Sequence, residues 1–376
     1  MPKVAIVHDW LTGMRGGERC LEVFCEIFPK ADLFTLLHVK GSVSRTIEEM
    51  RVKTSALQRL PFAEKKYRYY LPLMPRLIEK FDLSTYDLVL SSSHCAAKGA
   101  RPGPNTSHIC YCYSPMRYIW DLHDSYFGKE GMGALEGLAM SLFMGYLRNW
   151  DRRTAKSVDK FIAISRFVAE RIRNCYGRES EVVYPPVNTS FYVPRNGPGD
   201  YFLMVTAMAP YKRVDLAVRA FNRLKLPLKI IGTGQMASRL REIAGPNIEF
   251  LGWRSDEEVR DAYAGCRAFI FPGVEDFGIT PLEAQSCGRP VIALGRGGAL
   301  ETVAPVNPEG TAGVPARQAT GVFFYEQDER ALEEAVMVFL RIEKDFQQDA
   351  IRRNALKFDR TEFKKSMEKH LKDFVI

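Results

Sequence analysis

Short β-branched runs alternate with amphipathic, helix-like stretches along most of the chain, and this alternation constrains the fold more than any other feature. The run KVAIVHDW at 3–10 is followed by the helix-like ERCLEVFCEIF, and the rhythm continues to EVVYPPV at 181–187. A second series begins with YFLMVTAM at 201–208 and extends to TGVFFY at 320–325. Such alternation indicates βαβ units and parallel sheets, so the sequence predicts an α/β fold.

Two domains fit both the chain length and a break in this rhythm. A chain of 376 residues is too long for one ordinary core. The stretch PPVNTSFYVPRNGPGD at 185–200 interrupts the alternation with turn-forming residues. We therefore predict an N-terminal domain at 1–195, a C-terminal domain at 196–350, and a helix at 351–376 that caps the second domain or crosses back to the first. The predicted fold class is two facing, Rossmann-like, doubly wound parallel sheets with an interdomain cleft.

Composition narrows the class of protein and its partners. The eight cysteines are scattered without a CxxC pair, so neither a zinc site nor a disulfide framework is expected. No segment reaches the ~18 consecutive apolar residues of a membrane-spanning helix, and the N-terminus MPKVAIVHDW lacks a signal-peptide pattern. The formal net charge of +8 favours anionic partners. We expect a soluble, cytoplasmic protein, and nucleic acid is not among its predicted partners.

The densest basic cluster is RLPFAEKKYRYYLPLMPRLIEKF at 59–81, where basic residues alternate with aromatic and aliphatic ones. One interpretation is that this segment docks the first domain on an anionic membrane surface, as a peripheral protein on the inner face of the cell membrane. Anionic lipids attract each nearby Lys or Arg by about 1 kcal/mol. The other interpretation is an ordinary surface helix with its aromatic side chains packed inward. The sequence leaves both open.

Ligands of parallel α/β domains bind at the carboxyl ends of the strands, so the loops that follow the strands are the first place to look for chemistry. In HDWLTGMRGGERC, Gly16 and Gly17 lie at the predicted start of a helix, whose N-terminus would favour an anion such as phosphate. The alternative is that the two glycines only form a tight βα turn. His94 follows the strand LVLSSS and precedes small residues, as in a ligand-contacting loop. Further candidates in this domain are His8, Arg117 and Asp121.

Two loops of the second domain carry basic or glycine-rich motifs. Lys212 and Arg213 lie at the start of a predicted helix, where the helix dipole disfavours cations, so they indicate a bound anion. A solvated basic pair is the alternative. Gly232 and Gly234 match a dinucleotide fingerprint, G-x-G-x-x-A, between a strand and a helix. That signal is weak, because the motif lies in the second βα unit of its domain rather than the first.

The segment GVEDFGITPLEAQSCGRPVIA at 273–293 places Glu275 and Glu283 on either side of a glycine turn. Thr280 as N-cap and Glu283 as the acid of a capping box, with Pro281 in the first turn, give Glu283 a structural role. Glu275 has no such role and is expected to project into the cleft. Backbone N–H groups at the helix start would come from Phe277, Gly278 and Ile279.

Together these motifs resemble glycosyltransferase family 4, whose members are retaining enzymes of the GT-B fold. The resemblance covers nearly the whole chain and is carried by RGGER, SSSHCAAKG, YSPMRYIWD, ISRFVAERI, YPPV, PYKRVDLAV, FLGW, the E-x7-E segment and GGALETV. The motifs are most similar to mannosyltransferases of the WbaZ type, which act in surface-polysaccharide synthesis. The resemblance implies a hexosyltransferase that moves mannose from GDP-mannose to a glycan or lipid-linked acceptor, with a UDP-sugar as the alternative donor.

The resemblance also implies roles for individual residues. Glu283 would bind the nucleotide ribose, Glu275 would lie beside the transferred sugar, and His94 would touch that sugar near the reacting carbon. Lys212 would neutralise the diphosphate, which Gly17 would approach. The turn from Phe277 to Thr280 would contact sugar hydroxyls and phosphate, whereas Arg117, Asp121 and His8 would lie on the acceptor side.

One departure and one absence bear on the chemistry. The family usually has an arginine five residues before the lysine, where this chain has Ala207, and Arg213 is expected to compensate. The chain has no DxD triplet or His/Asp cluster that would hold a divalent metal, so we expect metal-independent activity without a cofactor. Two alternatives remain: a nicotinamide-dependent oxidoreductase that uses Gly232 and Gly234, and a non-catalytic protein that keeps the fold as a scaffold.

Overall fold

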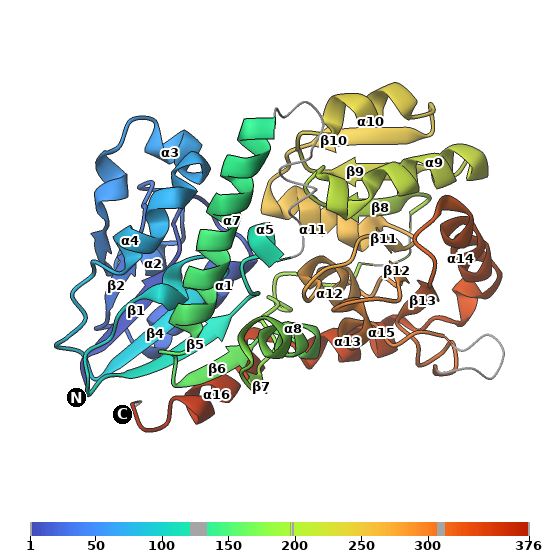
Figure 1. Cartoon of the computed structure of the whole chain (residues 1–376). Coiled ribbons are helices and arrows are strands. Elements are labelled where there is room, and N and C mark those ends of the chain that lie inside the picture. The colour runs from blue at the N-terminus through green and yellow to red at the C-terminus, as the bar shows by residue number, and fades with distance from the viewer. Residues whose placement is uncertain (1, 121–133, 196, 198, 307–312, 375–376) are drawn as a thin grey trace. The chain divides into compact units, whose positions relative to one another are not determined.

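The computed structural model describes residues 2–120, 134–195, 197, 199–306 and 313–374. Its contacts divide the chain into two units. Unit 1 comprises Met1–Pro185 and Phe363–Ile376, and unit 2 comprises Pro186–Glu362. Each unit is an α/β domain built on one parallel sheet (Figure 1). The predicted class of two doubly wound parallel-sheet domains is confirmed.

The division falls after Pro185, ten residues before the predicted end of the first domain at 195. The residues after Pro185 in the turn-rich stretch 185–200 belong to unit 2, because arginines of that unit bind their carbonyl oxygens. Arg289 Nη2 donates to the carbonyl oxygen of Gly197 at 2.6 Å, and Arg352 Nη2 donates to that of Thr189 at 3.1 Å. The segment predicted as one helix at 351–376 contains two, and only the end of the chain, from Phe363, belongs to unit 1.

Unit 1 contains a seven-stranded parallel sheet of order β3-β2-β1-β4-β5-β6-β7. The central strands are buried along their whole length, as expected for a sheet covered on both faces. The order reverses between β1 and β4, which makes a topological switch point where ligands usually bind. The strands are β1 (Val4–His8), β2 (Asp32–Thr35), β3 (Arg51–Thr54), β4 (Leu88–Ser93), β5 (Ser107–Cys112), β6 (Lys160–Ala163) and β7 (Glu181–Val182).

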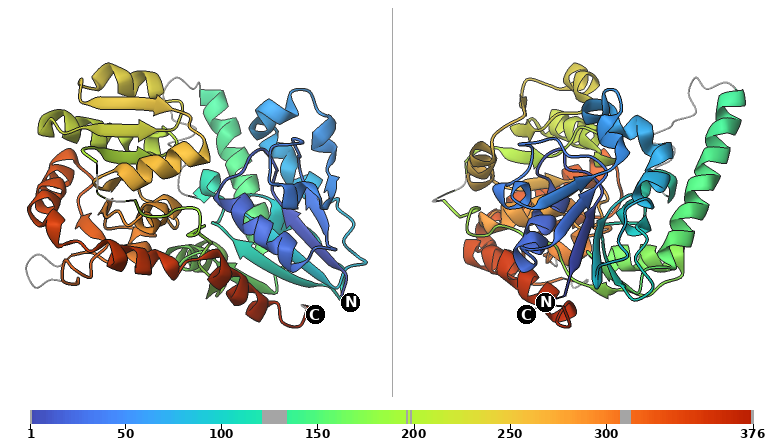
Figure 2. Two further views of the ribbon diagram at one scale, coloured as in Figure 1. Left: turned by 180° about the vertical axis from the view of Figure 1, so that it is seen from behind. Right: turned by 90° about the vertical axis from the view of Figure 1, so that its left-hand side faces the viewer.

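Helices cover both faces of this sheet. Phe363 packs on Phe24 and on Tyr111 of β5, so the C-terminal helix α16 covers the same face as α1. Helix α7 lies on the opposite face (Figure 2), where Trp150 joins Met74 in a buried cluster. The helices are α1 (Gly16–Ile27), α2 (Arg45–Glu48), α3 (Ala63–Lys66), α4 (Met74–Ile78), α5 (Arg117–Trp120), α7 (Ala134–Ala155), α8 (Arg166–Tyr176) and α16 (Arg360–His370), with 3₁₀ turns η1 (Ala56–Arg59), η2 (Tyr67–Leu73) and η3 (Ala97–Gly99).

Unit 2 contains a six-stranded parallel sheet of order β10-β9-β8-β11-β12-β13, with its switch point between β8 and β11. The strands are β8 (Phe202–Val205), β9 (Leu228–Ile231), β10 (Ile248–Gly252), β11 (Phe269–Phe271), β12 (Val291–Leu294) and β13 (Gly321–Phe324). The helices are α9 (Val214–Leu224), α10 (Ala237–Ile243), α11 (Asp256–Gly265), α12 (Ile279–Ser286), α13 (Ala299–Thr302), α14 (Glu329–Ile342) and α15 (Gln348–Leu356), with 3₁₀ turns η4 (Pro210–Lys212) and η5 (Glu343–Asp345).

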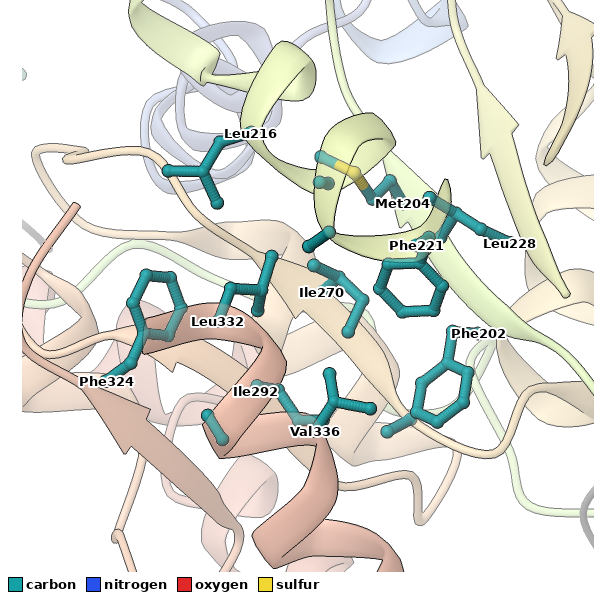
Figure 3. Close-up of a cluster of buried hydrophobic side chains, with 14 of the residues drawn as sticks. Phe202, Met204, Leu216, Phe221, Leu228, Ile270, Ile292, Phe324, Leu332 and Val336 are labelled. Carbon is teal, nitrogen blue, oxygen red and sulfur yellow. The ribbon is translucent and has the colours of Figure 1, made fainter. Parts of the chain in front are cut away.

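The core of unit 2 lies between the sheet and helices α9 and α14. Phe202 and Ile270 of the sheet, Phe221 of α9 and Val336 of α14 point toward one another and are almost completely buried (Figure 3). Burying a side chain of this size contributes about 1.5–3 kcal/mol each. This packing fixes the strands whose carboxyl ends carry the candidate residues. Among the described residues, no helix has the length and apolar character needed to cross a membrane.

Candidate active-site residues

Asp9 organises the switch point of unit 1. It directly follows β1, is fully buried, and accepts four backbone N–H groups of the loop after β4. Its Oδ2 accepts from His94 at 2.7 Å and Cys95 at 3.0 Å, and its Oδ1 accepts from Ala96 at 2.6 Å and Ala97 at 2.7 Å. Asp9 is not among the residues predicted from the sequence, although an acid directly after the first strand, in HDW, was the available signal.

Asp9 also orients His94. The Nδ1 atom of His94 lies 2.9 Å from Asp9 Oδ2, and the ring meets Trp10 edge-on with centroids 4.6 Å apart. Burial lowers the pKa of His94, but the charge of Asp9 and their hydrogen bond outweigh it, so the pKa is raised. Burial raises the pKa of Asp9, yet the neighbouring His94 holds it well below the usual range. The pair therefore fixes the proton on Nδ1 and leaves Nε2 for a ligand.

His8 and Gly17 belong to one hydrogen-bonded network beside this pair. His8 is fully buried, with Nδ1 3.0 Å from Ser92 Oγ and Nε2 3.6 Å from Glu18 Oε1. Ser92 Oγ lies 2.8 Å from the hydroxyl of Tyr113, which donates to the carbonyl oxygen of Gly17 at 2.8 Å. This burial favours a positioning role for His8 at the start of α1 over the predicted acceptor contact.

Lys212 and Glu275 form an ion pair at the switch point of unit 2. Lys212 ends the 3₁₀ turn η4 after β8, and its Nζ contacts Oε1 of Glu275, which follows β11. The neighbouring Arg213 has a left-handed backbone (φ 52°), and its guanidinium bonds Asp215 Oδ1 at 3.2 Å and the carbonyl oxygen of Gln327 at 3.4 Å. Because these oxygens already hold the guanidinium, the structure does not support the expectation that Arg213 replaces the arginine that the family usually has at the position of Ala207.

The start of α12 differs from the predicted capping box. Gly278, with a left-handed backbone (φ 100°), is the N-cap, and the helix begins at Ile279 rather than after Thr280. Left-handed backbone is readily available only to glycine, which explains the earlier start. Glu283 is buried and accepts instead from the hydroxyl of Tyr263 on α11, at 2.9 Å. The capping-box prediction for Thr280 and Glu283 is therefore wrong, and Glu283 is held by a tyrosine.

The glycine pair of GGALETV supports the turn that carries Glu275. Gly298 N–H donates to the carbonyl oxygen of Glu275 at 2.8 Å. A β-carbon on Gly298 would come within 2.2 Å of Phe277 Cα, and one on Gly297 within 2.6 Å of the Glu275 carbonyl oxygen. Both positions therefore require glycine for close approach of the two loops. Neither glycine is among the site residues predicted from the sequence.

Gly232 and Gly234 have a packing reason for being glycine. A β-carbon on Gly232 would lie 1.9 Å from the carbonyl oxygen of Thr206, and one on Gly234 would lie 2.5 Å from that of Met208. The loop after β9 thus packs directly on the loop after β8. This contact accounts for the G-x-G spacing without a dinucleotide. On the acceptor side, Arg117 begins α5, and Asp121 lies outside the described residues.

Two family descriptions match adjacent parts of the chain. "Glycosyltransferase Family 4" matches residues 34–191, and "Glycosyl transferases group 1" matches residues 189–357. The chain belongs to the family 4 glycosyltransferases. The recognition made from the sequence motifs is thereby confirmed, and the two matches together span most of both units of this glycosyltransferase.

Curated relatives of this glycosyltransferase include named mannosyltransferases at low identity. An uncharacterized glycosyltransferase of Methanocaldococcus jannaschii is 29% identical over 150 residues, which cover 39% of this chain and 42% of the relative. A GDP-mannose-dependent phosphatidylinositol monomannoside mannosyltransferase of Corynebacterium glutamicum is 28% identical over 186 residues (41% and 49%). O-antigen chain mannosyltransferase C of Escherichia coli is 31% identical over 144 residues (36% of each). Each match spans less than half of the relative's length.

Solved structures match the glycosyltransferase over nearly its whole length. Anabaena HepE in complex with UDP has a TM-score of 0.72 at 14% identity and covers 99% of this chain and 100% of its own. Sucrose-phosphate synthase of Thermosynechococcus elongatus has a TM-score of 0.73 at 15% identity, covering 99% of each chain. At such identities the likeness concerns the fold, and it confirms the predicted GT-B architecture.

Proposed function

We propose that this glycosyltransferase is a retaining hexosyltransferase that moves mannose from GDP-mannose to a glycan or lipid-linked acceptor in surface-polysaccharide synthesis of the O-antigen or lipopolysaccharide type. The Lys212–Glu275 ion pair at the switch point of unit 2 is the observation that carries the reaction class. The printed names of the Corynebacterium and Escherichia relatives support mannose and, for the former, GDP-mannose. A UDP-sugar is the second candidate donor, favoured by the UDP in the HepE structure.

The proposed glycosyl transfer depends mainly on stabilisation of the charge that develops in the transition state. Breaking the anomeric C–O bond of a nucleotide sugar leaves negative charge on the departing diphosphate, and a preorganised cation lowers that barrier. In the free protein, Glu275 neutralises Lys212. A bound diphosphate would compete for the ammonium group and release the Glu275 carboxylate toward the transferred sugar. We infer that Lys212 replaces a divalent metal here and that no cofactor is required.

His94 and Glu283 complete the proposed assignment. Asp9 holds a proton on His94 Nδ1 and raises the pKa of the ring, so that the protonated ring can donate a hydrogen bond from Nε2 to a sugar oxygen near the reacting carbon. Tyr263 orients the Glu283 carboxylate toward the ribose. Burial, followed by the charge of Glu283, raises the pKa of Tyr263 well above its usual value, so its hydroxyl stays a donor. Gly16, Gly17 and the turn from Phe277 to Thr280 are the proposed phosphate contacts.

A thermal-shift panel tests the donor. The protein is heated with GDP-mannose, UDP-glucose, UDP-N-acetylglucosamine or dTDP-rhamnose, each with and without EDTA. A ligand that binds only the folded state at about 100 times its Kd adds ~2.7 kcal/mol to the free energy of unfolding. We expect GDP-mannose to raise Tm most, and equally with EDTA. A larger shift with a UDP-sugar would select the second donor, and a shift abolished by EDTA would refute metal independence.

The two glutamates are expected to differ in kinetic effect. Glu283→Gln keeps an oxygen for the Tyr263 hydroxyl but removes the charge that binds ribose, so KM for the donor should rise about tenfold with little change in kcat. Glu275→Gln should instead lower kcat about 10²-fold, since this carboxylate acts beside the transferred sugar. Steady-state kinetics of both variants are the measurement. Similar changes in KM and kcat for the two variants would contradict this division of roles.

The basic segment 59–81 exposes apolar and basic side chains together, which favours membrane docking over inward packing. It forms α3, η2 and α4, and only part of its aromatic content is buried, as at Tyr67. Phe62 is 76% and Tyr69 is 81% exposed. Phe62 also has a left-handed backbone (φ 54°), uncommon for a bulky residue. The same segment exposes six bases: Arg59, Lys65, Lys66, Arg68, Arg76 and Lys80. We propose that this surface holds unit 1 on an anionic bilayer, where lipid-linked acceptors lie.

Charge reversal tests this docking. Lys65→Glu, Lys66→Glu and Arg68→Glu together replace three bases that each contribute about 1 kcal/mol near an anionic surface. Cosedimentation with phosphatidylglycerol-containing vesicles should fall at least tenfold, with Tm unchanged because all three side chains are exposed. The matched control reverses three exposed bases of unit 2: Arg219, Lys225 and Arg239. Equal cosedimentation of both triple variants and the wild type would eliminate segment 59–81 as the docking surface.

A further inference from the structure

Lys98 is a buried lysine of the 3₁₀ turn η3, three residues after Cys95. Its Nζ lies 2.7 Å from Asp151 Oδ1 and donates to the Asp151 carbonyl oxygen at 2.8 Å and to Thr154 Oγ1 at 3.1 Å. The ammonium group also lies over the rings of Trp150 and Tyr176. Lys98 thus links the 3₁₀ turn η3, which follows the His94 loop, to helix α7.

Asp151 binds two further elements through its other oxygen. This residue is fully buried in α7, and its Oδ2 accepts from Trp120 Nε1 of α5 and from the hydroxyl of Tyr176 of α8, both at 2.8 Å. Helix α5 begins with Arg117, the acceptor-side candidate. One carboxylate therefore connects the His94 loop with the segment that carries Arg117.

The junction between η3 and α7 admits little variation. A β-carbon on Gly99 would lie 2.3 Å from Trp150 Cζ2, so the two elements touch directly. A buried ion pair adds little net stability compared with apolar side chains of similar volume, but it can specify one arrangement. Directly before Lys98, Ala96 and Ala97 donate their N–H groups to Asp9, as His94 does at the start of the loop. The loop is therefore held on Asp9 along its length and anchored to α7 at its C-terminal end.

We propose that Lys98 and Asp151 are a positioning pair, which holds the loop after β4 so that Asp9 and His94 keep their mutual geometry. This inference rests on the role proposed above for His94, but not on the identity of the donor. It predicts an effect on His94 itself, which can be measured without any substrate. The charged groups that act on His94 are Asp9, Glu18 and Arg15, so the loop position sets its titration.

The test compares stability with the titration of His94. Lys98→Met alone leaves a buried carboxylate unpaired and should unfold easily, whereas Lys98→Met with Asp151→Asn leaves no stranded charge and keeps an acceptor for Trp120. The double variant should regain most of the wild-type Tm. Its His94 Nδ1–Asp9 bond should loosen, so the NMR titration midpoint of His94 should move down and kcat should fall about tenfold. The NMR signal of His94 can be assigned by substitution, because the chain has six histidines.

Two further variants decide between positioning and mere stability. Leu57→Ala opens a cavity in the same buried cluster as Trp150 without touching the pair, and it should lower Tm while leaving the His94 midpoint unchanged. Thr154→Val removes one oxygen from Nζ without stranding a charge, and should shift the midpoint in the same direction by a smaller amount. A wild-type midpoint in both the double variant and Thr154→Val overturns the proposal. A shifted midpoint with no activity in the wild type would instead refute the proposed function.

Discussion

Asp9→Asn is expected to lower kcat by at least about 10²-fold, because it removes the charge that orients and stabilises His94. The same change costs stability, since the carboxylate accepts four backbone N–H groups in a fully buried position. Breaking a buried charge pair costs about 3–5 kcal/mol. Urea unfolding and steady-state kinetics measure the two effects. Asp82→Asn, an identical change at an exposed position, is the control and should alter neither.

The pH dependence of the free energy of unfolding distinguishes the contribution of Asp9 from that of His94. The folded-state pKa of Asp9 lies below its ordinary value of 3.8, so its contribution is present at neutral pH and is lost as pH falls below that value. The folded-state pKa of His94 lies above 6.5, so its contribution is complete below 6.5 and is lost as pH rises through the raised pKa. Asp9→Asn should remove both dependences, whereas His94→Gln should remove the second and weaken the first, because only the backbone N–H groups would then still stabilise the Asp9 carboxylate. An unchanged pH profile in Asp9→Asn would contradict the pairing.

Lys212→Ala is expected to lower kcat/KM about 10³-fold, the largest loss in unit 2, because it removes the proposed cation for the leaving diphosphate. Arg213→Ala is the matched control. It removes the same charge one residue away, but Arg213 is engaged with Asp215 and Gln327, so its loss should cost less than about tenfold. Donor kinetics at two ionic strengths measure both. Equal losses would mean that a diffuse basic surface, rather than Lys212, acts on the diphosphate.

The fold followed closely from the sequence because β-strand and helix periods alternate in both halves. Buried parallel strands need continuous apolar runs, and the loops after them were therefore easy to locate. Lys212, Glu275 and His94 were found in this way, and each lies at a switch point of its sheet. The division lies ten residues before the predicted bound at 195, since the residues after Pro185 are bound to unit 2 by arginines far along the chain, such as Arg289 and Arg352.

Two of the three missed features depend on contacts between distant segments, and the third depends on local backbone conformation. An acid such as Asp9 is indistinguishable from a surface acid until the loop after β4 is seen to point its N–H groups at it. The T-P-x-E spacing at 280–283 fits a capping box, but the left-handed backbone of Gly278 starts the helix earlier. Lys98 in SSSHCAAKG gave no sign of burial, because its partner Asp151 lies 53 residues away. Sequence pattern located the loops, and tertiary contacts show which side chains meet in them.

Release of nucleoside diphosphate from GDP-mannose tests the central claim most directly. The wild type is incubated with GDP-mannose, EDTA and a lipid extract as the source of acceptor, and GDP and mannosylated product are quantified. We predict product formation with retained α-configuration by NMR, equal rates with and without EDTA, and loss of both products in Lys212→Ala. Absence of nucleoside diphosphate release from GDP-mannose and from the UDP-sugars alike would contradict the account, because the fold would then serve a purpose other than glycosyl transfer.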